Sequence, residues 1–179
     1  MTDFQAVKDK ITLHWGEMGT RWGINRTMAQ VHALLFISEK PLSAEEIMEE
    51  LQISRGNVSM SLRELMNWGI VYKMHIKGER KEFYTTEKDV WQFFKIISRE
   101  RKKREIDPTM NTLREVLADL EGETTPESVY ARQQLASLLE LVEIGENLYA
   151  VIEDLTPNSL TGLVRQVMQF MQKRGGGGN

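Results

Sequence analysis

LSAEEIMEELQISRGNVSMSLREL, residues 42–65, is the stretch that decides the predicted fold of this chain. Ser43 is placed to cap a helix, and Glu46, three residues later, completes the capping-box pattern. Apolar residues then recur at helical spacing on both sides of the short turn at residues 52–54, namely Ile47, Leu51, Val58, Leu62 and Leu65. Two short helices that share one apolar seam across a tight turn form a helix-turn-helix.

The second helix of this motif has an outer face of small, hydrogen-bonding and cationic residues. Its members are Arg55, Asn57, Ser59, Met60 and Arg63. A helix with this face, and with the positive end of its dipole at the N-terminus, suits the major groove of DNA. An ordinary helical hairpin with a solvated polar face would show the same seam, so the following residues decide between the two interpretations.

A basic β-hairpin is predicted directly after the motif. Gly69 fits a left-handed helix end, residues 70–76 and 81–85 have strand patterns, and residues 77–80 form the turn between them. The hairpin tip carries the cations Lys77, Arg80 and Lys81. Such cations can follow phosphates or enter a minor groove, although charged hairpin tips also serve solubility alone. A helix-turn-helix followed by a basic hairpin is the element order of a winged helix, and the two features together favour DNA binding.

The charge of the chain is distributed unevenly. The whole chain of 179 residues carries a formal net charge of −3. Residues 55–104 hold 13 Lys/Arg and 6 Asp/Glu, a net charge of +7, whereas residues 107–179 hold 5 and 11, a net charge of −6. A basic region around the hairpin and an acidic C-terminal part predict different roles for the two.

Helical patterns account for the sequence before the motif. Residues 3–19 are expected to form a helix that bends or breaks, because Gly16, Gly19 and Gly23 interrupt its pattern. Residues 26–38 are apolar enough for a buried helix, and His32 within it is interpreted as a satisfied core residue. Leu42 is expected to give the short first strand of the winged helix.

Helices are also predicted after the hairpin. One starts at Glu87 and is interrupted by Asp107-Pro108, and another covers residues 109–121. The longest runs from Pro126 to about Asp154, and a last helix covers about Leu160 to Lys173. The predicted fold class is therefore mainly α with a small β-hairpin wing: a winged helix-turn-helix domain plus a helical dimerisation region.

The predicted domains are a DNA-binding winged helix at residues 20–105 and a helical dimerisation region at residues 1–19 and 106–174. Residues 175–179 are expected to be a disordered tail, because a run of four glycines cannot pack. The longest helix has a stripe of Leu135, Leu138, Leu139, Val142, Leu148, Val151, Ile152 and Leu155. This is more apolar surface than two helices can bury against each other, so a second copy is the economical partner, with an intrachain bundle as the alternative.

Several classes of chemistry have no support in the sequence. The absence of cysteine excludes disulfides, thiolate catalysis and cysteine-ligated metals. The three histidines, His14, His32 and His75, have no metal-ligand spacing, and GxSxG, P-loop and GxGxxG motifs are missing. We therefore expect no enzyme activity, no cofactor and no metal. Without an apolar run of transmembrane length or a signal-peptide core, the expected location is the cytoplasm.

Three stretches resemble the MarR-type winged-helix transcriptional regulators, and more narrowly their GbsR branch, named for the regulation of glycine betaine synthesis. They are WGINRTMAQVHALLF (22–36), the stretch 42–65 and NWGIVYKMHIKGERKEFY (67–84). The resemblance covers about residues 10–105, and the C-terminal third matches only as helices. It implies a homodimer, a pseudo-palindromic operator in double-stranded DNA, and repression as the commonest mode. It does not specify the small-molecule effector; members related to betaine metabolism are associated with choline or similar osmolytes, but the branch is broad.

Two alternatives remain open at this stage. Aromatic faces attract quaternary ammonium groups, so Trp15, Trp22, Trp91 and Tyr130 or Tyr149 are a candidate cage, but aromatic residues at helical spacing are usually core. The predicted function is sequence-specific DNA binding by a dimer that controls transcription. The rival is a winged helix used as a protein-interaction module, which would need neither a basic wing nor salt-sensitive DNA affinity.

Overall fold

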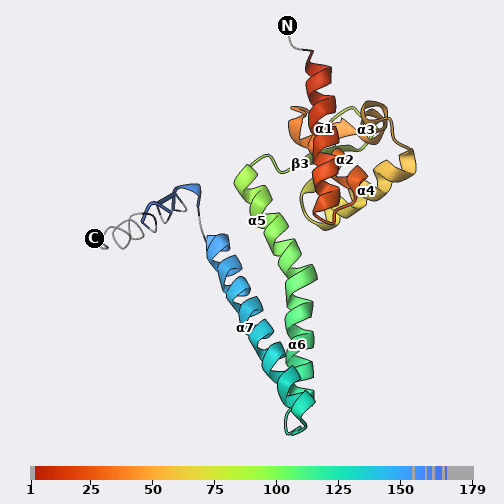
Figure 1. The fold of residues 1–179 in the computed structure, drawn as a ribbon. Coiled ribbons are helices and arrows are strands. Elements are labelled where there is room, and N and C mark those ends of the chain that lie inside the picture. Colours follow the sequence, from red (N-terminus) through yellow and green to blue (C-terminus); the bar gives the residue numbers. More distant parts are fainter. Residues whose placement is uncertain (1–2, 155, 160, 163, 167, 169–179) are drawn as a thin grey trace. The chain divides into compact units, whose positions relative to one another are not determined.

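The computed structural model describes residues 3–154, 156–159, 161–162, 164–166 and 168 (Figure 1). The chain divides into two units, Met1–Ile97 and Ser98–Asn179. The described part is mainly helical with one small antiparallel sheet, as the sequence predicts. Leu155, most of the predicted last helix from Leu160 to Lys173, and the tail at residues 175–179 lie outside the described residues or at gaps among them.

The first unit has the element order of a winged helix. Its elements are α1 (Phe4–Arg21), α2 (Arg26–Ile37), β1 (Leu42–Ser43), α3 (Ala44–Leu51), α4 (Arg55–Asn67), β2 (Val71–Met74), β3 (Phe83–Thr86) and the start of α5 (Val90–Arg101). The strands form an antiparallel sheet in the order β1-β3-β2, in which Tyr84 lies opposite Leu42 on one side and Lys73 on the other. β3 therefore pairs with both β1 and β2, so that the first strand and the hairpin form one sheet.

The helix-turn-helix forms as its capping residues predict. The Ser43 hydroxyl accepts a hydrogen bond from the Glu46 amide at 3.3 Å, and the Glu46 carboxylate accepts one from the Ser43 amide at 2.7 Å. Gln52 adopts a left-handed conformation with φ 52°, which ends α3. The Ser54 hydroxyl then caps α4 by accepting a hydrogen bond from the backbone N–H of Asn57 at 3.3 Å. Both ends of the turn are thus set by local hydrogen bonds.

The core of this unit fixes which face of α4 points outward. Val31, Leu34 and Leu35 of α2 are buried against Ile47 of α3 and against α4, whose buried apolar residues are Val58, Leu62 and Leu65. Full burial of each such side chain contributes about 1.5–3 kcal/mol. Because these three residues of α4 lie on one side of the helix, the opposite side faces solvent.

The expectation that glycines bend or break the first helix is wrong. α1 runs without interruption from Phe4 to Arg21, and Gly16 and Gly19 are buried within it. A Cβ atom at Gly19 would lie 2.6 Å from the Ala29 Cβ of α2, so the missing side chain lets the two helices approach closely. Packing against α2 outweighs the cost of a glycine inside a helix, about 1 kcal/mol. Only Gly23, with φ +74°, lies at the helix end.

We expect Gly19→Ala to destabilise the protein by about 1–3 kcal/mol, because the new methyl group overlaps a rigid neighbour and the helices must separate. The control is Gly56→Ala in α4, where the nearest atom to an added Cβ is 3.9 Å away, and it should stabilise by about 0.5–1 kcal/mol. Urea denaturation measures both. Wild-type stability in Gly19→Ala would show that the α1–α2 contact is looser than described.

His32 is buried, but it is not satisfied as the sequence interpretation had it. Its side chain is 4% exposed, and Nε2 has no hydrogen-bond partner among the described residues. The ring stacks on Phe93 of α5, with 4.6 Å between ring centroids and 13° between planes. Burial, helped by the charge of Lys88, lowers the pKa of His32 to about 4. His32 is therefore a neutral aromatic member of the core at pH 7.

The second unit is a helical hairpin, and it corrects one further expectation. The end of α5 continues through η1, a π-helix (Lys102–Ile106), into α6 (Asp107–Asp119) without a break, so Asp107-Pro108 does not interrupt the helix. A proline ring clashes with the carbonyl group four residues earlier in a regular helix, and the wider π turn relieves this contact. α7 (Pro126–Asp154) returns beside α6.

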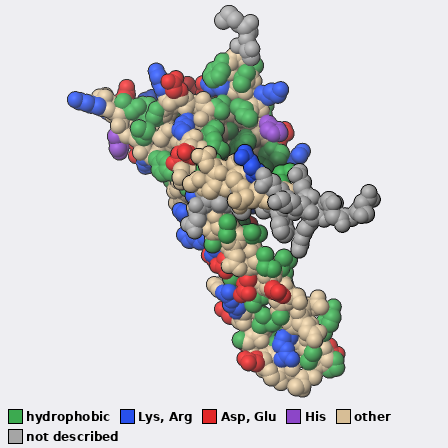
Figure 2. Space-filling model, turned by 90° about the vertical axis from the view of Figure 1, so that its left-hand side faces the viewer, with side chains coloured by type: hydrophobic (Ala, Val, Ile, Leu, Met, Phe, Trp, Pro, Cys, Tyr) green, Lys and Arg blue, Asp and Glu red, His purple; other side chains and the backbone are tan. Residues whose placement is uncertain are grey.

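The longest helix carries two apolar stripes. One is half-buried in the hairpin and includes Leu135, Leu139 and Val142, whereas the other is exposed and consists of Leu138, Leu141, Ile144, Leu148 and Val151. None of the described side chains of α7 is buried, whereas Met110 and Leu113 of α6 are. Figure 2 shows hydrophobic side chains on the surface of this hairpin. Among the described residues, no helix is long and apolar enough to cross a membrane.

Candidate nucleic-acid interface

The predicted DNA-reading residues all lie on the exposed face of α4. Arg55, Asn57, Ser59, Met60 and Arg63 are each exposed. Met60 is 63% exposed, although methionine is among the residues most often buried in a protein core. The buried side of α4 is occupied by Val58, Leu62 and Leu65, so the core itself presents this polar face to solvent.

The predicted wing residues lie in the loop between β2 and β3. Lys77, Arg80 and Lys81 are exposed, and Gly78, with φ +92°, supplies the left-handed backbone of the turn. The Lys81 ammonium group lies 3.9 Å from the carboxylate of Glu45 at the start of α3. The loop thus carries its cations next to the helix-turn-helix.

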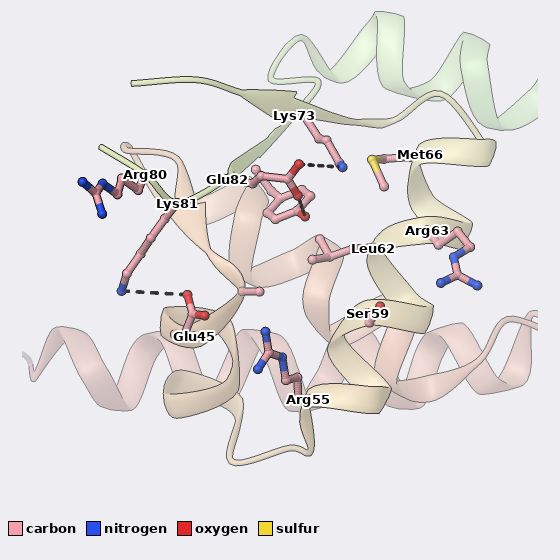
Figure 3. Close-up of a pocket in the computed structure, with 12 residues that line it drawn as sticks. Glu45, Arg55, Ser59, Leu62, Arg63, Met66, Lys73, Arg80, Lys81 and Glu82 are labelled. Atoms are coloured by element: carbon pink, nitrogen blue, oxygen red, sulfur yellow. Dashed lines mark hydrogen bonds and ion pairs between the residues drawn. The ribbon is translucent and has the colours of Figure 1, made fainter. Parts of the chain in front are cut away.

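A groove of about 490 Å³ separates α4 from the hairpin (Figure 3). α4 contributes Arg55, Ser59 and Arg63 to its lining, and the hairpin contributes Lys73, Arg80 and Lys81. The groove therefore brings together five of the eight predicted site residues. Asn57, Met60 and Lys77 lie outside its lining.

Sequence reasoning missed three charged residues of this groove: Glu45, Lys73 and Glu82. The Lys73 ammonium group lies 2.9 Å from Glu82 Oε1, and the Tyr84 hydroxyl donates to Glu82 Oε2 at 3.0 Å. Lys73 follows the buried Val71 by two positions, so both lie on one face of β2. This alternation could have placed Lys73 on the same face as Val71. The residues that lie next to Lys73, however, depend on the strand register, which the alternation does not give.

The groove is electropositive, with five Arg or Lys residues against two Glu residues in its lining. Hydrogen bonds from Lys73 and Tyr84 hold the pKa of Glu82 below its usual value. Burial, together with the hydrogen bond to Glu82, raises the pKa of Tyr84 to about 12. Glu82 therefore stays charged and Tyr84 stays a donor at neutral pH. Such an arrangement can bind a polyanion through fixed cations on two sides.

The aromatic residues of the candidate cage are spread over different places. Trp15 of α1 and Trp22, which follows the end of α1, meet edge to face at 6.1 Å. Trp91 packs on Phe94, and Tyr130 and Tyr149 belong to the second unit. A separate apolar cavity of about 340 Å³ is lined by Ile11, Trp15, His32, Ala33, Phe36, Ile37, Val90 and Phe93. In the described part of the chain, no cluster of three or more His, Asp or Glu residues is placed to hold a metal.

The helix-turn-helix matches a known family model, described as "bacterial regulatory protein, arsR family", over residues 29–73. The matched residues run from α2 to β2 and leave out β3 and the helices that follow. This match concerns the motif and is compatible with several branches of winged-helix regulators.

Curated relatives and one solved structure extend the similarity. YvaV of Bacillus subtilis (strain 168), whose name places it with the HTH-type transcriptional regulators, is 27% identical over 137 residues, 72% of this chain and 75% of its own. The HTH-type transcriptional repressor GbsR of the same organism is 25% identical over 65% of this chain and 64% of its own. The repressor OpcR is 30% identical over 41% and 40%.

The similarity of fold is supported independently. The crystal structure of a transcriptional regulator superimposes with a TM-score of 0.62 at 16% identity and covers 80% of this chain and 92% of that chain. Element order, the motif match and the relatives agree with one another. The chain is therefore a winged-helix transcriptional regulator.

Proposed function

We propose that this regulator binds operator DNA as a homodimer, with α4 in the major groove and the wing on the neighbouring backbone. The observation that carries this proposal is the groove between α4 and the hairpin, where cations from both elements face one open space. A recognition helix needs an exposed polar face held by a rigid core, and α4 has both.

The exposed side chains of α4 match the donor and acceptor pattern of base edges. Arginine makes bidentate hydrogen bonds to guanine and asparagine to adenine, which fits Arg63 and Asn57. The exposed Met60 offers an apolar contact for a thymine methyl group. Arg55 and Ser59 lie on the same face, and Lys77, Arg80 and Lys81 are assigned to phosphates along the wing.

We assign dimerisation to the helical part of the chain, with residues 20–105 as the DNA-binding domain and residues 1–19 and 106–174 as the dimerisation region. The exposed stripe of α7, from Leu138 to Val151, is the main support. An apolar stripe of this length on one helix is typical of a surface that a partner covers. A twofold dimer would place two copies of α4 on half-sites about 34 Å, or a multiple of it, apart.

The finer assignment is a MarR-type regulator of the GbsR branch that represses transcription and responds to a small molecule. Its support is the resemblance over residues 10–105 and the names of the relatives, two of which are repressors. The apolar cavity lined by His32 is the candidate effector site, since residues of α1, α2 and α5 form its walls. A regulator that binds chromosomal DNA would act in the cytoplasm.

The alanine variants Arg63→Ala and Asn57→Ala are each expected to weaken binding to the specific site by about 1–3 kcal/mol. Affinity for unrelated DNA should change less, because neither residue is assigned to phosphates. Arg21→Ala, which removes an exposed arginine at the end of α1, is the matched control. Gel shifts with specific and scrambled duplexes measure the difference. Unchanged sequence preference in both variants would contradict the assignment of this face.

Selection of bound sequences from random duplex DNA tests the proposed function as a whole. A regulator should enrich a pseudo-palindrome, and repeating the selection with candidate osmolytes should reveal an effector. Enrichment of no sequence, together with no salt-dependent affinity, would favour the protein-interaction module instead.

A further inference from the structure

The cations of the groove fall into two groups. Among the described residues, Arg55, Arg63 and Arg80 make no ion pair, whereas both lysines face a carboxylate. Lys73 lies 2.9 Å from Glu82, and Lys81 lies 3.9 Å from Glu45 (Figure 3). All four of these side chains are between 44% and 57% exposed, so DNA can reach them.

The two carboxylates contribute little to the stability of the fold. Exposed ion pairs contribute little, because solvent screens them and the long side chains lose freedom. Glu45 lies in the first turn of α3, where its charge favours the helix dipole, but this effect is small at an exposed position and the capping box itself uses Ser43 and Glu46. Glu82 is held in place by the hydroxyl of Tyr84, which is 7% exposed and anchored in the core. The fold thus positions acidic groups in a groove that otherwise attracts phosphates.

We propose that Glu45 and Glu82 compete with DNA phosphates for Lys81 and Lys73, and thereby keep the affinity of the regulator for non-specific DNA low. This inference rests on the proposed DNA-binding function. When a phosphate takes the lysine, the carboxylate is left beside the negative charge of the DNA. It must then take up a salt cation, which offsets one of the cations released from the DNA. Binding through phosphates alone is weakened, and base contacts from α4 must supply more of the affinity.

The test compares Glu45→Gln and Glu82→Gln with Glu49→Gln in the full chain. Glutamine keeps the size and a hydrogen-bond acceptor for the Tyr84 hydroxyl. Glu49 is an exposed residue on the same helix as Glu45 and does not line the groove, so it controls for net charge. The probe is a random-sequence duplex of about three helical turns, followed by fluorescence anisotropy over a range of salt concentrations. Thermal melting checks that each variant is folded.

We expect each groove variant to bind the random duplex about two- to fivefold more tightly than wild type. The dependence of log affinity on log salt should steepen by up to about one unit, and Glu49→Gln should change both quantities less. A double-mutant cycle with Lys73→Ala separates competition from general charge repulsion. Glu82→Gln should have little effect once Lys73 is absent, whereas a general charge effect would persist.

Affinity and salt dependence equal to those of Glu49→Gln would overturn the inference. Weaker binding by the groove variants would overturn it too, since it would mean that the carboxylates contact DNA bases, as acids do with cytosine. If wild type binds the duplex with salt-dependent affinity and the two groove variants bind it no more tightly than wild type, this inference falls but the proposed function stands. If wild type shows no salt-dependent binding at all, both proposals fall.

Discussion

Leu141→Glu combined with Leu148→Glu is expected to convert the proposed dimer to a monomer. Both side chains are exposed on α7, at 65% and 60%, so the substitutions leave the hairpin itself intact. Two carboxylates in an interface of apolar side chains would be buried without partners, which costs several kcal/mol. Light scattering at micromolar protein concentration measures the change.

The same double variant should lose operator affinity by about 100-fold or more, because each winged helix must then bind its half-site independently. The matched control is Gln133→Glu with Gln134→Glu, which adds the same charges at exposed polar positions of α7. Leu139→Glu should behave differently, since Leu139 is half-buried and its loss would destabilise the hairpin. A wild-type chain that is a monodisperse monomer and still binds one palindrome tightly would contradict the dimer.

Acid is expected to destabilise the protein through His32, by about 3 kcal/mol between pH 6.5 and pH 4. The pKa of His32 is lowered to about 4 in the folded protein, whereas the unfolded chain has the ordinary value of 6.5. In this window the unfolded state binds the proton and the folded state does not. The free energy of unfolding is therefore unaffected by the titration of His32 above pH 6.5 and falls as the pH drops from 6.5 towards 4. Below pH 4, His32 causes no further change.

His32→Phe tests this assignment, because phenylalanine keeps the ring stacked on Phe93 and cannot titrate. Urea denaturation at several pH values should give a shallower fall in the free energy of unfolding for the variant between pH 6.5 and 4. The carboxyl groups with lowered pKa values, Glu50 and Glu82, contribute to acid sensitivity equally in both proteins. Equal slopes for wild type and variant would show that His32 is not the responsible group.

Local signals in the sequence were sufficient for the helix-turn-helix. Ser43 with Glu46, the turn ending at Ser54, and the seam of Val58, Leu62 and Leu65 specify hydrogen bonds and packing between residues close in the chain. The same local periodicity predicted that Arg63 and its neighbours on α4 face solvent. These features depend on helical geometry alone, so a single sequence contains them.

Features that depend on contacts between distant segments were not predictable in this way. From sequence alone, Gly19 is predicted to break the helix, because its contact with Ala29 of another helix cannot be read from local spacing. The sequence stripe of α7 mixed residues that face α6, such as Leu139, with exposed ones such as Leu148, because periodicity does not say which neighbour covers a face.

By itself, the sequence determined the winged-helix order, the exposed polar face of α4 and the charged hairpin loop, because each follows from spacing along one element. Only the tertiary structure decided that His32 is buried without a partner and that Lys73 faces Glu82. It also decided that Glu45 of α3 lies 3.9 Å from Lys81 of the hairpin loop. The physical reason is that burial and ion pairing depend on strand register and helix packing, which bring together residues that no local pattern connects.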